Sequence, residues 1–339
     1  MNSDIHNAIK NEYEKKQKKA YDNLEFRRKK AFAEVPGLEE IEDKIHKIGL
    51  KYNKMILQGI KPTDEILSAL LKDIDNLKRE KVQLLVANGY PEDYLEIKYE
   101  CQKCKDTGFI DSSAGSVRCS CYKQQMINYM YKSSNLKLIE KENFTTFNPD
   151  LYSDAVDKAK YGINISPRQN ILKIKDRCMK FIENFDYPDE KNLFFYGPTG
   201  VGKTFMCNCI AMELIKKGKT VLYQTAPIIF NIINEYKIRA FNDGDFQDES
   251  YKSIFETELL IIDDLGTETQ SAARYAELLT ILNVRQMNNL QRPCKTIIST
   301  NISPRKLYEN YTERVASRIV GCFEGLLFVG EDLRGKKAL

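Results

Sequence analysis

Long apolar runs are missing from this sequence of 339 residues, which argues against a secreted or membrane-spanning protein. The first residues, Met1–Ile5, lack the apolar stretch of a signal peptide. The strongest apolar run, at 259–262, is far too short to cross a bilayer. We therefore expect a cytoplasmic protein with no membrane partner. Hydrophobic residues at 42% and charged residues at 29% are typical of a globular chain and exclude a disordered one.

A strong charge bias is also missing, since the net charge at pH 7 is only +4. A net charge this small permits contact with nucleic acid but does not indicate it. The length is more informative, because chains usually divide into domains of about 100 to 200 residues. We therefore expect a main domain with a smaller appended region.

Disulfide bonds are not expected, although the chain has nine cysteines. An odd number of cysteines in a long chain with no sign of secretion favours reduced thiols or metal ligation. Four are grouped as two pairs, Cys101 with Cys104 and Cys119 with Cys121. The other five lie in apolar settings and are interpreted as core residues: Cys178, Cys207, Cys209, Cys294 and Cys322.

The grouped cysteines predict a zinc site. Four thiolates in two close pairs suit tetrahedral Zn²⁺, because short loops can aim two sulfurs at one point. The pair Cys119 and Cys121 is tighter than the usual pair with two intervening residues. An alternative is that the cysteines are small buried hydrophobes, but polar residues adjoin them: Gln102, Lys103, Arg118 and Ser120. Four sulfur ligands leave no position for water, so we expect a structural rather than a catalytic site.

The first 95 residues have the Lys-, Glu- and Leu-rich composition of long exposed helices. Breaks at 36–37 and at Gly59 divide this region into three helices. Apolar residues recur at steps of three and four over 38–55 and over 67–84. Two such seams joined by a short loop predict an antiparallel helical hairpin, which we interpret as a partner-docking region.

From about residue 144 onward, apolar runs typical of strands alternate with amphipathic helices. The expected strands are 192–196, 220–224, 259–262, 296–299 and 325–329. This alternation is typical of an α/β fold in which helices cover both faces of a parallel sheet. Such sheets bind ligands at the carboxyl ends of their strands, so residues that follow the strands are the candidates for function.

A phosphate-binding loop follows the first expected strand. It matches the P-loop pattern in full, with the residues Gly197, Pro198, Thr199, Gly200, Val201, Gly202, Lys203 and Thr204. The backbone N–H groups of such a loop wrap nucleotide phosphates at a helix N-terminus. Lys203 is expected to reach the β and γ phosphates, and the Thr204 hydroxyl to bind Mg²⁺.

Two adjacent carboxylates follow the strand at 259–262. Asp263 leaves the C-terminal end of this strand and is expected to hold the magnesium ion. Asp264 is the candidate to orient and activate the attacking water, with Glu268 as the reserve candidate because a glutamate reaches further. Together with the P-loop, these acids predict a nucleoside triphosphatase.

Polar groups near the later strands complete this prediction. Asn301 follows the strand at 296–299, where its amide can bridge the γ-phosphate and the attacking water. Arg314, Arg318 and Arg334 come further along the chain. The planar fork of an arginine suits phosphate oxygens, and such residues supply transition-state charge in NTPases.

The order of these motifs resembles one family. The motifs are the P-loop, then Leu-Ile-Ile-Asp-Asp-Leu-Gly-Thr-Glu at 260–268, Ile-Ser-Thr-Asn at 298–301, Glu-Arg-Val-Ala-Ser-Arg-Ile at 313–319 and Gly-Glu-Asp-Leu-Arg at 330–334. From about Phe144 to Leu339 the chain is similar to the AAA+ helicase loaders of the DnaC and DnaI type and to the related IstB transposition helpers. The segment at 143–147 resembles the start of the family's ATPase domain.

The resemblance implies roles for the later residues. Asn301 corresponds to sensor 1, and Arg334 to the sensor 2 arginine that contacts the nucleotide of its own subunit. Arg318 corresponds to the arginine finger that points into a neighbouring subunit, with Arg314 as the alternative. We therefore expect a partner-docking helical region at 1–95, a zinc knuckle and linker at 96–140, and an AAA+ ATPase domain at 141–339. Over the first 140 residues the chain resembles the zinc-bearing N-terminal part of DnaI-like loaders only in kind, through its long helical segment and its knuckle of cysteines.

The function implied by the resemblance is ATP-dependent loading of a hexameric replicative DNA helicase. The cofactors would be ATP, Mg²⁺ and Zn²⁺, and the partners the helicase, single-stranded DNA and further copies of the chain that associate in the presence of ATP. Two alternatives remain open. One is a transposase helper ATPase of the IstB type, and the other is an adaptor in which ATP acts as a switch and hydrolysis is negligible.

Overall fold

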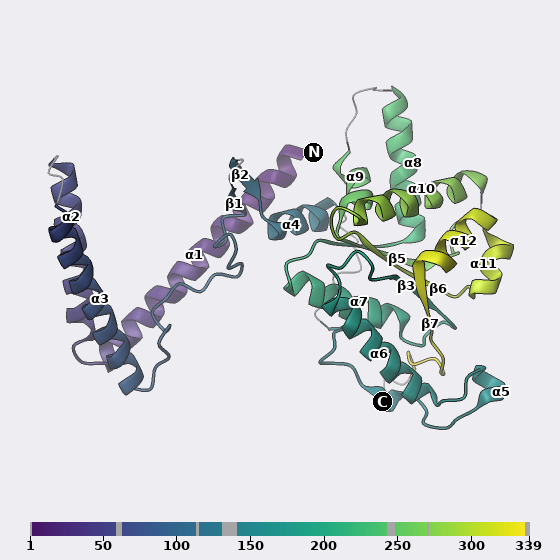
Figure 1. Ribbon diagram of the computed structural model, residues 1–339, viewed down its shortest axis with the longest axis horizontal. Coiled ribbons are helices and arrows are strands. Elements are labelled where there is room, and N and C mark those ends of the chain that lie inside the picture. The colour runs from purple at the N-terminus through teal and green to yellow at the C-terminus, as the bar shows by residue number, and fades with distance from the viewer. Residues whose placement is uncertain are drawn as a thin grey trace. The chain divides into compact units, whose positions relative to one another are not determined.

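The computed structural model describes residues 2–58, 63–112, 115–130, 141–242, 248–269 and 271–335 (Figure 1). The chain forms two compact units, one of His6–Cys119 and the other of Ser120–Leu339 together with Met1–Ile5. The three regions expected from the sequence stay a prediction, because the boundary expected after residue 140 adjoins residues outside the described part. Among the described helices, none is both long and apolar enough to cross a membrane.

Three long helices make up most of the His6–Cys119 unit: α1 (Asn2–Glu34), α2 (Leu38–Leu57) and α3 (Asp64–Ala87). The expected break between the first two is confirmed, and it uses Gly37 in the left-handed conformation, at φ 83°, which glycine adopts without steric cost. The break expected at Gly59 lies outside the described residues. At the start of α3, the Thr63 side chain accepts a hydrogen bond from the N–H of Ile66 and caps the helix.

The helices α2 and α3 pack against each other side by side (Figure 1). The seam residues Ile48 and Ile74 are partly buried, as expected for a helix pair with a narrow apolar contact. An ion pair between Lys81 and Glu42 also joins the two helices. The base of the pair is better packed, because Leu38 and Leu85 are fully buried there. The predicted helical N-terminal region is therefore confirmed.

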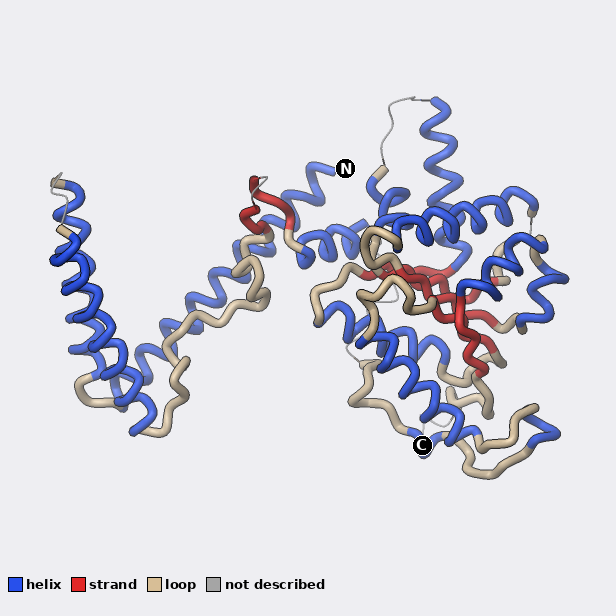
Figure 2. Tube along the Cα trace, viewed as in Figure 1, coloured by secondary structure: helices blue, strands red, loops and turns tan. Residues whose placement is uncertain are grey.

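Five parallel strands form the sheet of the second unit (Figure 2). They are β3 (Asn192–Tyr196), β4 (Val221–Thr225), β5 (Leu259–Leu265), β6 (Lys295–Thr300) and β7 (Phe323–Leu327). Their spatial order is β4-β5-β6-β3-β7, so β6 lies between the strand of the P-loop and the strand of the two aspartates. The predicted five-stranded parallel α/β sheet is confirmed.

Four of the five strands have bounds that differ from the expected ones; β5 continues to Leu265, and β6 covers Lys295–Thr300. The strand expected at 220–224 begins one residue later, since the N–H of Thr220 donates to the side chain of Glu258 instead of to the sheet. The strand expected at 325–329 begins at Phe323, which follows the last helix directly and pairs with Asn192. These shifts fall within the about two to four residues over which element ends are ill-defined by sequence pattern.

Helices cover both faces of this sheet (Figure 1). They are α4 (Ser120–Met130), α6 (Pro167–Glu183), α7 (Lys203–Lys216), α8 (Ala226–Asn242), α9 (Glu249–Glu256), α10 (Ala272–Asn289), α11 (Pro304–Asn310) and α12 (Glu313–Cys322), whereas the short α5 (Lys158–Tyr161) has no buried residue. Successive side chains of a strand point to opposite faces, so Leu193 and Phe195 pack with α6 and α7 while Phe194 packs with α8, α10 and α12. Each such buried side chain contributes about 1.5–3 kcal/mol. Two apolar layers therefore hold the sheet rigid.

A buried arginine joins one helical layer to the sheet. Arg285 of α10 is 1% exposed and donates to the backbone oxygens of Ile254, Thr257 and Lys295. It also donates to the Thr296 hydroxyl at 2.9 Å. Burial lowers the pKa of Arg285 to about 10, so the side chain is charged at neutral pH. Its donors satisfy buried carbonyls at the end of α9 and the start of β6, as buried polar groups require.

We expect Arg285→Met to destabilise the protein by about 3 kcal/mol, because buried carbonyl groups would lose their donors. Urea denaturation of the full chain would measure this change. The matched control is Arg292→Met, at an exposed position just beyond the same helix, which should change stability by less than about 0.5 kcal/mol. Equal stability of the two variants would contradict the assigned role of Arg285.

Candidate nucleotide-binding site

The P-loop connects the end of β3 to the start of α7. Two of its glycines are required by close approaches. At Gly197, φ is 143° and an added Cβ would lie 2.1 Å from the backbone oxygen of Phe328. At Gly200, φ is 79° and an added Cβ would lie 2.1 Å from the carboxylate of Asp332. Gly202 precedes α7 without any side-chain cap, so the first N–H groups of the helix are available for an anion.

Lys203 is the first residue of α7, directly after the glycines of the P-loop, and only 6% of its surface is exposed. Its ammonium group donates to the backbone oxygens of Gly197 at 2.8 Å and Pro198 at 2.6 Å. It also donates to Oδ1 of Asn301 at 2.8 Å. Burial lowers the pKa of Lys203. The lysine of the P-loop and the asparagine that follows β6 are therefore in direct contact, although 98 positions separate them in the chain.

The sheet order also brings Asp263 to the P-loop. Asp263, in β5, is 2% exposed, and its Oδ2 accepts hydrogen bonds from the Thr204 hydroxyl at 3.1 Å and the Tyr223 hydroxyl at 2.7 Å. A carboxylate beside a hydroxyl is the kind of oxygen set that Mg²⁺ prefers in nucleotide sites. The two residues expected to hold the magnesium ion are thus adjacent, and their chemistry fits the ion.

The two candidates for activating water lie in different surroundings. Asp264 lines the pocket, and its backbone is left-handed, at φ 53°, which is uncommon outside glycine. Burial and the neighbouring Asp263 raise the pKa of Asp264, which makes its carboxylate a stronger base. Glu268 is 6% exposed and accepts hydrogen bonds from the Tyr311 hydroxyl and from the N–H of Gly266. Both oxygens of Glu268 therefore have partners that hold it in the fold, and Asp264 is the better placed of the two.

The three candidate arginines, Arg314, Arg318 and Arg334, also differ in whether they line the pocket. Arg334 lines the pocket, where its N–H donates to the Asp332 carboxylate at 2.9 Å. Arg314 and Arg318 lie on α12 and do not line it. The Arg318 guanidinium donates to the side chain of Gln286 at 2.8 Å, and Arg314 is exposed. Within one chain, therefore, only Arg334 of these three borders the described pocket.

The pocket of about 240 Å³ beside the P-loop also contains residues to which the sequence had assigned no role in the site. They come from residues 142–152 and include Phe147 and Leu151. Tyr152 is 6% exposed, and its hydroxyl donates to the backbone oxygen of Val201 at 3.1 Å. An added Cβ on Gly202 would lie 2.4 Å from this hydroxyl. The aromatic residues before the first strand were the available signal, but only the fold shows that they border the P-loop.

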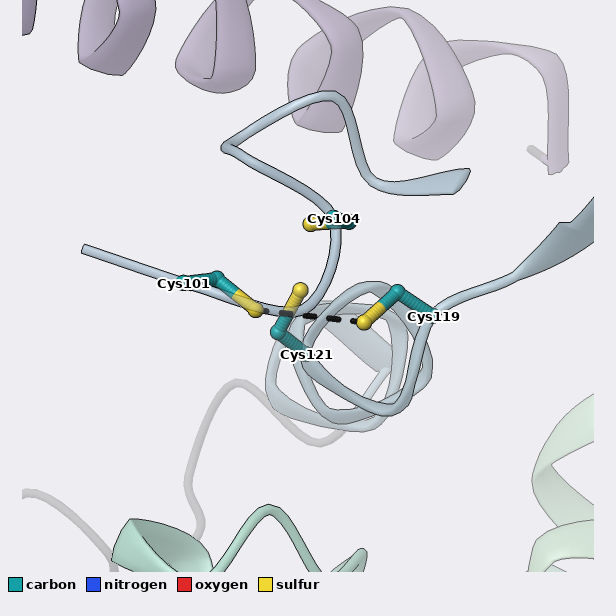
Figure 3. A group of neighbouring side chains, drawn as sticks. All are labelled: Cys101, Cys104, Cys119 and Cys121. Carbon is teal, nitrogen blue, oxygen red and sulfur yellow. Dashed lines mark hydrogen bonds between the residues drawn. The ribbon is translucent and has the colours of Figure 1, made fainter. Parts of the chain in front are cut away.

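The four grouped cysteines converge, as Figure 3 shows. The sulfurs of Cys101, Cys104, Cys119 and Cys121 all lie within 4.8 Å of one another, and those of Cys101 and Cys119 are 3.9 Å apart. Tetrahedral metal–sulfur bonds of about 2.3 Å require sulfurs about 3.8 Å apart, so this group can hold a metal ion.

The loop that carries the first cysteine pair is held by its own backbone contacts. Asp106 is 1% exposed and accepts hydrogen bonds from the N–H groups of Glu100 and Cys101, at 2.9 and 2.8 Å. The N–H of Gly108 points at the Cys104 sulfur, at 3.3 Å. A short antiparallel pair, β1 (Phe109–Ser112) and β2 (Gly115–Arg118), leads from this loop to the second pair of cysteines. The sequence pattern had not indicated these two strands.

The remaining cysteines contribute to packing. Cys178, Cys207 and Cys209 are fully buried in the layer of α6 and α7, and Cys294 is 2% exposed. Cys322 is partly buried against the other layer. Burial raises the pKa of Cys207 well above its usual value, so this thiol stays protonated. The expected use of these five cysteines as core residues agrees with their positions.

Comparison with known proteins connects this site to a family. Residues 160–306 match the family of IstB-like ATP binding proteins. This segment is similar to the IstB-like ATP binding proteins. It contains the P-loop, both aspartates and Asn301, whereas the arginines of α12 and Arg334 follow it. The predicted P-loop fold agrees with this match, and the geometry of the pocket fits a nucleotide.

Two curated relatives extend over parts of the chain. The replicative helicase loader DnaC of Escherichia coli is 26% identical over 159 residues, which is 47% of this chain and 60% of DnaC. The chromosomal replication initiator protein DnaA of Campylobacter jejuni is 26% identical over 250 residues, which is 72% of this chain and 51% of DnaA. The chain thus spans about half to three fifths of the relatives it matches. The predicted resemblance to DnaC-type AAA+ loaders, related to IstB, is confirmed.

Two solved structures are similar to part of the chain. The crystal structure of the DnaC helicase loader is 25% identical to the chain, with a TM-score of 0.42, and the match covers 57% of this chain and 99% of that one. The crystal structure of DnaI is 22% identical, with a TM-score of 0.39, over 58% of this chain and 100% of that one.

Proposed function

We propose that this protein is an ATP-dependent loader of a replicative DNA helicase that acts in the cytoplasm. It binds the helicase through residues 1–95 and single-stranded DNA through AAA+ domains that assemble in the presence of ATP. The observation that carries the proposal is the pocket in which Lys203, Asp264, Asn301 and Arg334 meet on an IstB-like domain. The likeness to DnaC supports the choice of a helicase as the partner.

The pocket residues have distinct roles in the proposed ATP hydrolysis. Lys203 binds the β and γ phosphates, while Asp264 accepts a proton from the attacking water. Asn301, which contacts Lys203, orients that water against the γ-phosphate. Arg334 stabilises negative charge on the transferred phosphoryl group. When bound by Thr204 and Asp263, Mg²⁺ neutralises charge on the β and γ phosphates.

The finger arginine is proposed to act between subunits. Arg318 lies on α12, outside the pocket of its own chain, so its charge is available to the nucleotide of a neighbouring copy. Such an arginine meets the γ-phosphate only when ATP is bound, and it thereby makes assembly depend on ATP. Arg314, exposed on the same helix, is the alternative finger.

The N-terminal region supports a docking role through its exposed apolar side chains. On α2, Leu50 is 53% exposed and Leu57 is 88% exposed, and on α3, Leu71 is 57% exposed. Apolar residues that a helical hairpin leaves in solvent suit contact with the helices of a partner. We assign the metal in the cysteine group as Zn²⁺, because four thiolates in tetrahedral spacing favour zinc.

Two further functions remain as alternatives. The match to the IstB-like family supports a transposase helper, in which the same ATP-dependent assembly would act on duplex DNA. An ATP-switched adaptor with negligible hydrolysis would use the same pocket. Turnover of ATP measured with and without single-stranded DNA separates the adaptor from the loader, because only the loader hydrolyses ATP at a measurable rate.

We expect helicase binding and DNA binding to respond to different substitutions in the full-length chain. Leu57→Asp should weaken binding of the hexameric helicase at least about tenfold without ATP, since a buried charge in an apolar contact is costly. Arg318→Ala should abolish ATP-dependent binding of a fluorescent single-stranded oligonucleotide and leave helicase binding intact. Gel filtration measures binding of the helicase, and fluorescence anisotropy measures binding of the oligonucleotide.

The matched control for Leu57→Asp is Val156→Asp. The Val156 side chain is also exposed, at 58%, but it lies in the unit of Ser120–Leu339. It should leave helicase binding unchanged. Oligonucleotide binding that is indifferent to ATP, or helicase binding that survives Leu57→Asp, would count against the loader. Preference for duplex over single-stranded DNA would favour the transposase helper.

A further inference from the structure

Tyr223 is a fully buried tyrosine that the mechanism above does not use. It lies in β4, within the apolar layer formed with α6 and α7, and has 0% of its surface exposed. Its hydroxyl nevertheless has a polar partner, because it donates a hydrogen bond to Oδ2 of Asp263 at 2.7 Å. We propose that Tyr223 is a positioning residue of the magnesium site, whose hydroxyl holds the Asp263 carboxylate in the orientation that binds Mg²⁺. This inference rests on the proposed use of ATP with Mg²⁺.

The strand register explains how Tyr223 reaches Asp263. In the pairing of β4 with β5, Tyr223 is opposite Ile261, and Thr225 is opposite Asp263. Tyr223 is therefore two residues behind the aspartate, about 7 Å along the strand, and its side chain shares the same face. A serine or threonine at this position would be too short to reach the carboxylate. A phenylalanine would fill the same space but would have no hydrogen to donate.

The donors around Asp263 show what the tyrosine adds. Oδ2 accepts from Tyr223 and from the Thr204 hydroxyl, and Oδ1 accepts from the N–H of Asp264 at 3.0 Å. Thr204 is itself expected to bind the ion, and the Asp264 N–H belongs to the backbone. Among the hydrogen-bond donors to Asp263 in the described part of the chain, Tyr223 is thus the side chain that is not also a proposed magnesium ligand. Donors of this kind orient a ligating carboxylate, and removing one typically lowers metal affinity about 10- to 100-fold.

The surroundings of Tyr223 make this hydrogen bond effective. Cys207 and Leu193, which belong to the same layer, are fully buried. Few polar groups are available in such a layer to compete for the carboxylate, and hydrogen bonds are electrostatically stronger there than in water. The carboxylate is thereby oriented before the ion arrives.

The test is Tyr223→Phe in the full-length protein, read by binding of a fluorescent ATP analogue at a series of Mg²⁺ concentrations. The Mg²⁺ concentration needed for half-maximal binding should rise about tenfold or more. Binding in excess EDTA should not change, and saturating Mg²⁺ should restore the affinity of the unaltered protein. The control is Tyr196→Phe, which changes a half-buried tyrosine of β3 whose side chain packs on the opposite face of the sheet.

A second variant separates the hydrogen bond from packing. Tyr223→Leu also lacks the hydroxyl but fills the core differently, and it should show the same shift in Mg²⁺ dependence. A shift in only one of the two variants, equal loss of binding with and without Mg²⁺, or no shift at all would overturn the inference. Nucleotide binding by the unaltered protein that is indifferent to Mg²⁺ would instead contradict the proposed function itself.

Discussion

Lys203→Ala should lower the rate of ATP hydrolysis about a hundredfold or more, because it removes one preorganised charge at the phosphates. The Lys203 ammonium lies 2.6–2.8 Å from two P-loop carbonyls and from Asn301, so its position is held before a nucleotide arrives. A positioned charge contributes more than a mobile one, since it costs no reorganisation during the reaction. Steady-state phosphate release from the purified variant measures the effect.

The control for this prediction lies on the same helix. Lys216→Ala removes an exposed lysine at the other end of α7, whose ion pair with Glu213 is on the surface, and it should leave turnover unchanged. Thermal melting of both variants should match the unaltered protein, because the fold is built from the two apolar layers. Undiminished ATP hydrolysis in the Lys203→Ala variant would refute the assignment of an ATPase site.

Replacement of a grouped cysteine should remove the bound metal altogether. The purified protein is expected to contain about one zinc per chain, and Cys101→Ser or Cys121→Ser should lose it together with the local fold. Structural zinc binding is coupled to folding, and its apparent free energy is large, about 10–16 kcal/mol in zinc-finger peptides. Elemental analysis measures the metal, and limited proteolysis near residues 101–121 measures the local fold.

ATP binding should persist in these cysteine variants, because the P-loop is formed by β3 and α7 of the sheet. The matched control is Cys322→Ser, a partly buried cysteine that lies outside the group, and it should keep its zinc. Zinc that remains stoichiometric in both Cys101→Ser and Cys121→Ser would show that the ligands are misassigned.

Much of the architecture could be predicted because it depends on local patterns. The alternation of apolar strands with amphipathic helices predicted the parallel sheet, and the seams at 38–55 and 67–84 predicted packed helices. The P-loop was recognisable because its chemistry needs consecutive residues. The short pair of β1 and β2 was missed, since four-residue strands with exposed side chains carry no apolar alternation.

The choice between Asp264 and Glu268 shows what a local sequence pattern cannot predict. Asp264 and Glu268 are both acids close to the end of β5, and the sequence left either able to activate water. The structure separates them because Glu268 is held by Tyr311, which is 43 positions away in the chain. Likewise, Tyr152 reaches the P-loop across 49 positions. Neither contact has a sequence spacing that could be recognised beforehand.

The sequence by itself therefore determined the long helices, the five strands of the parallel sheet, the phosphate-binding loop and the grouping of the cysteines, because each depends on residues close together in the chain. Only the tertiary structure decided which polar groups meet. The strand order β4-β5-β6-β3-β7 places β6 between β3 and β5, and this brings Asn301 to Lys203 and Asp263 to Thr204. The same pairing of β4 with β5 turns Tyr223, which looks like one more apolar strand residue, into a donor to Asp263. Strand order is set by how the helical layers pack on the sheet, and that packing is a property of the whole fold.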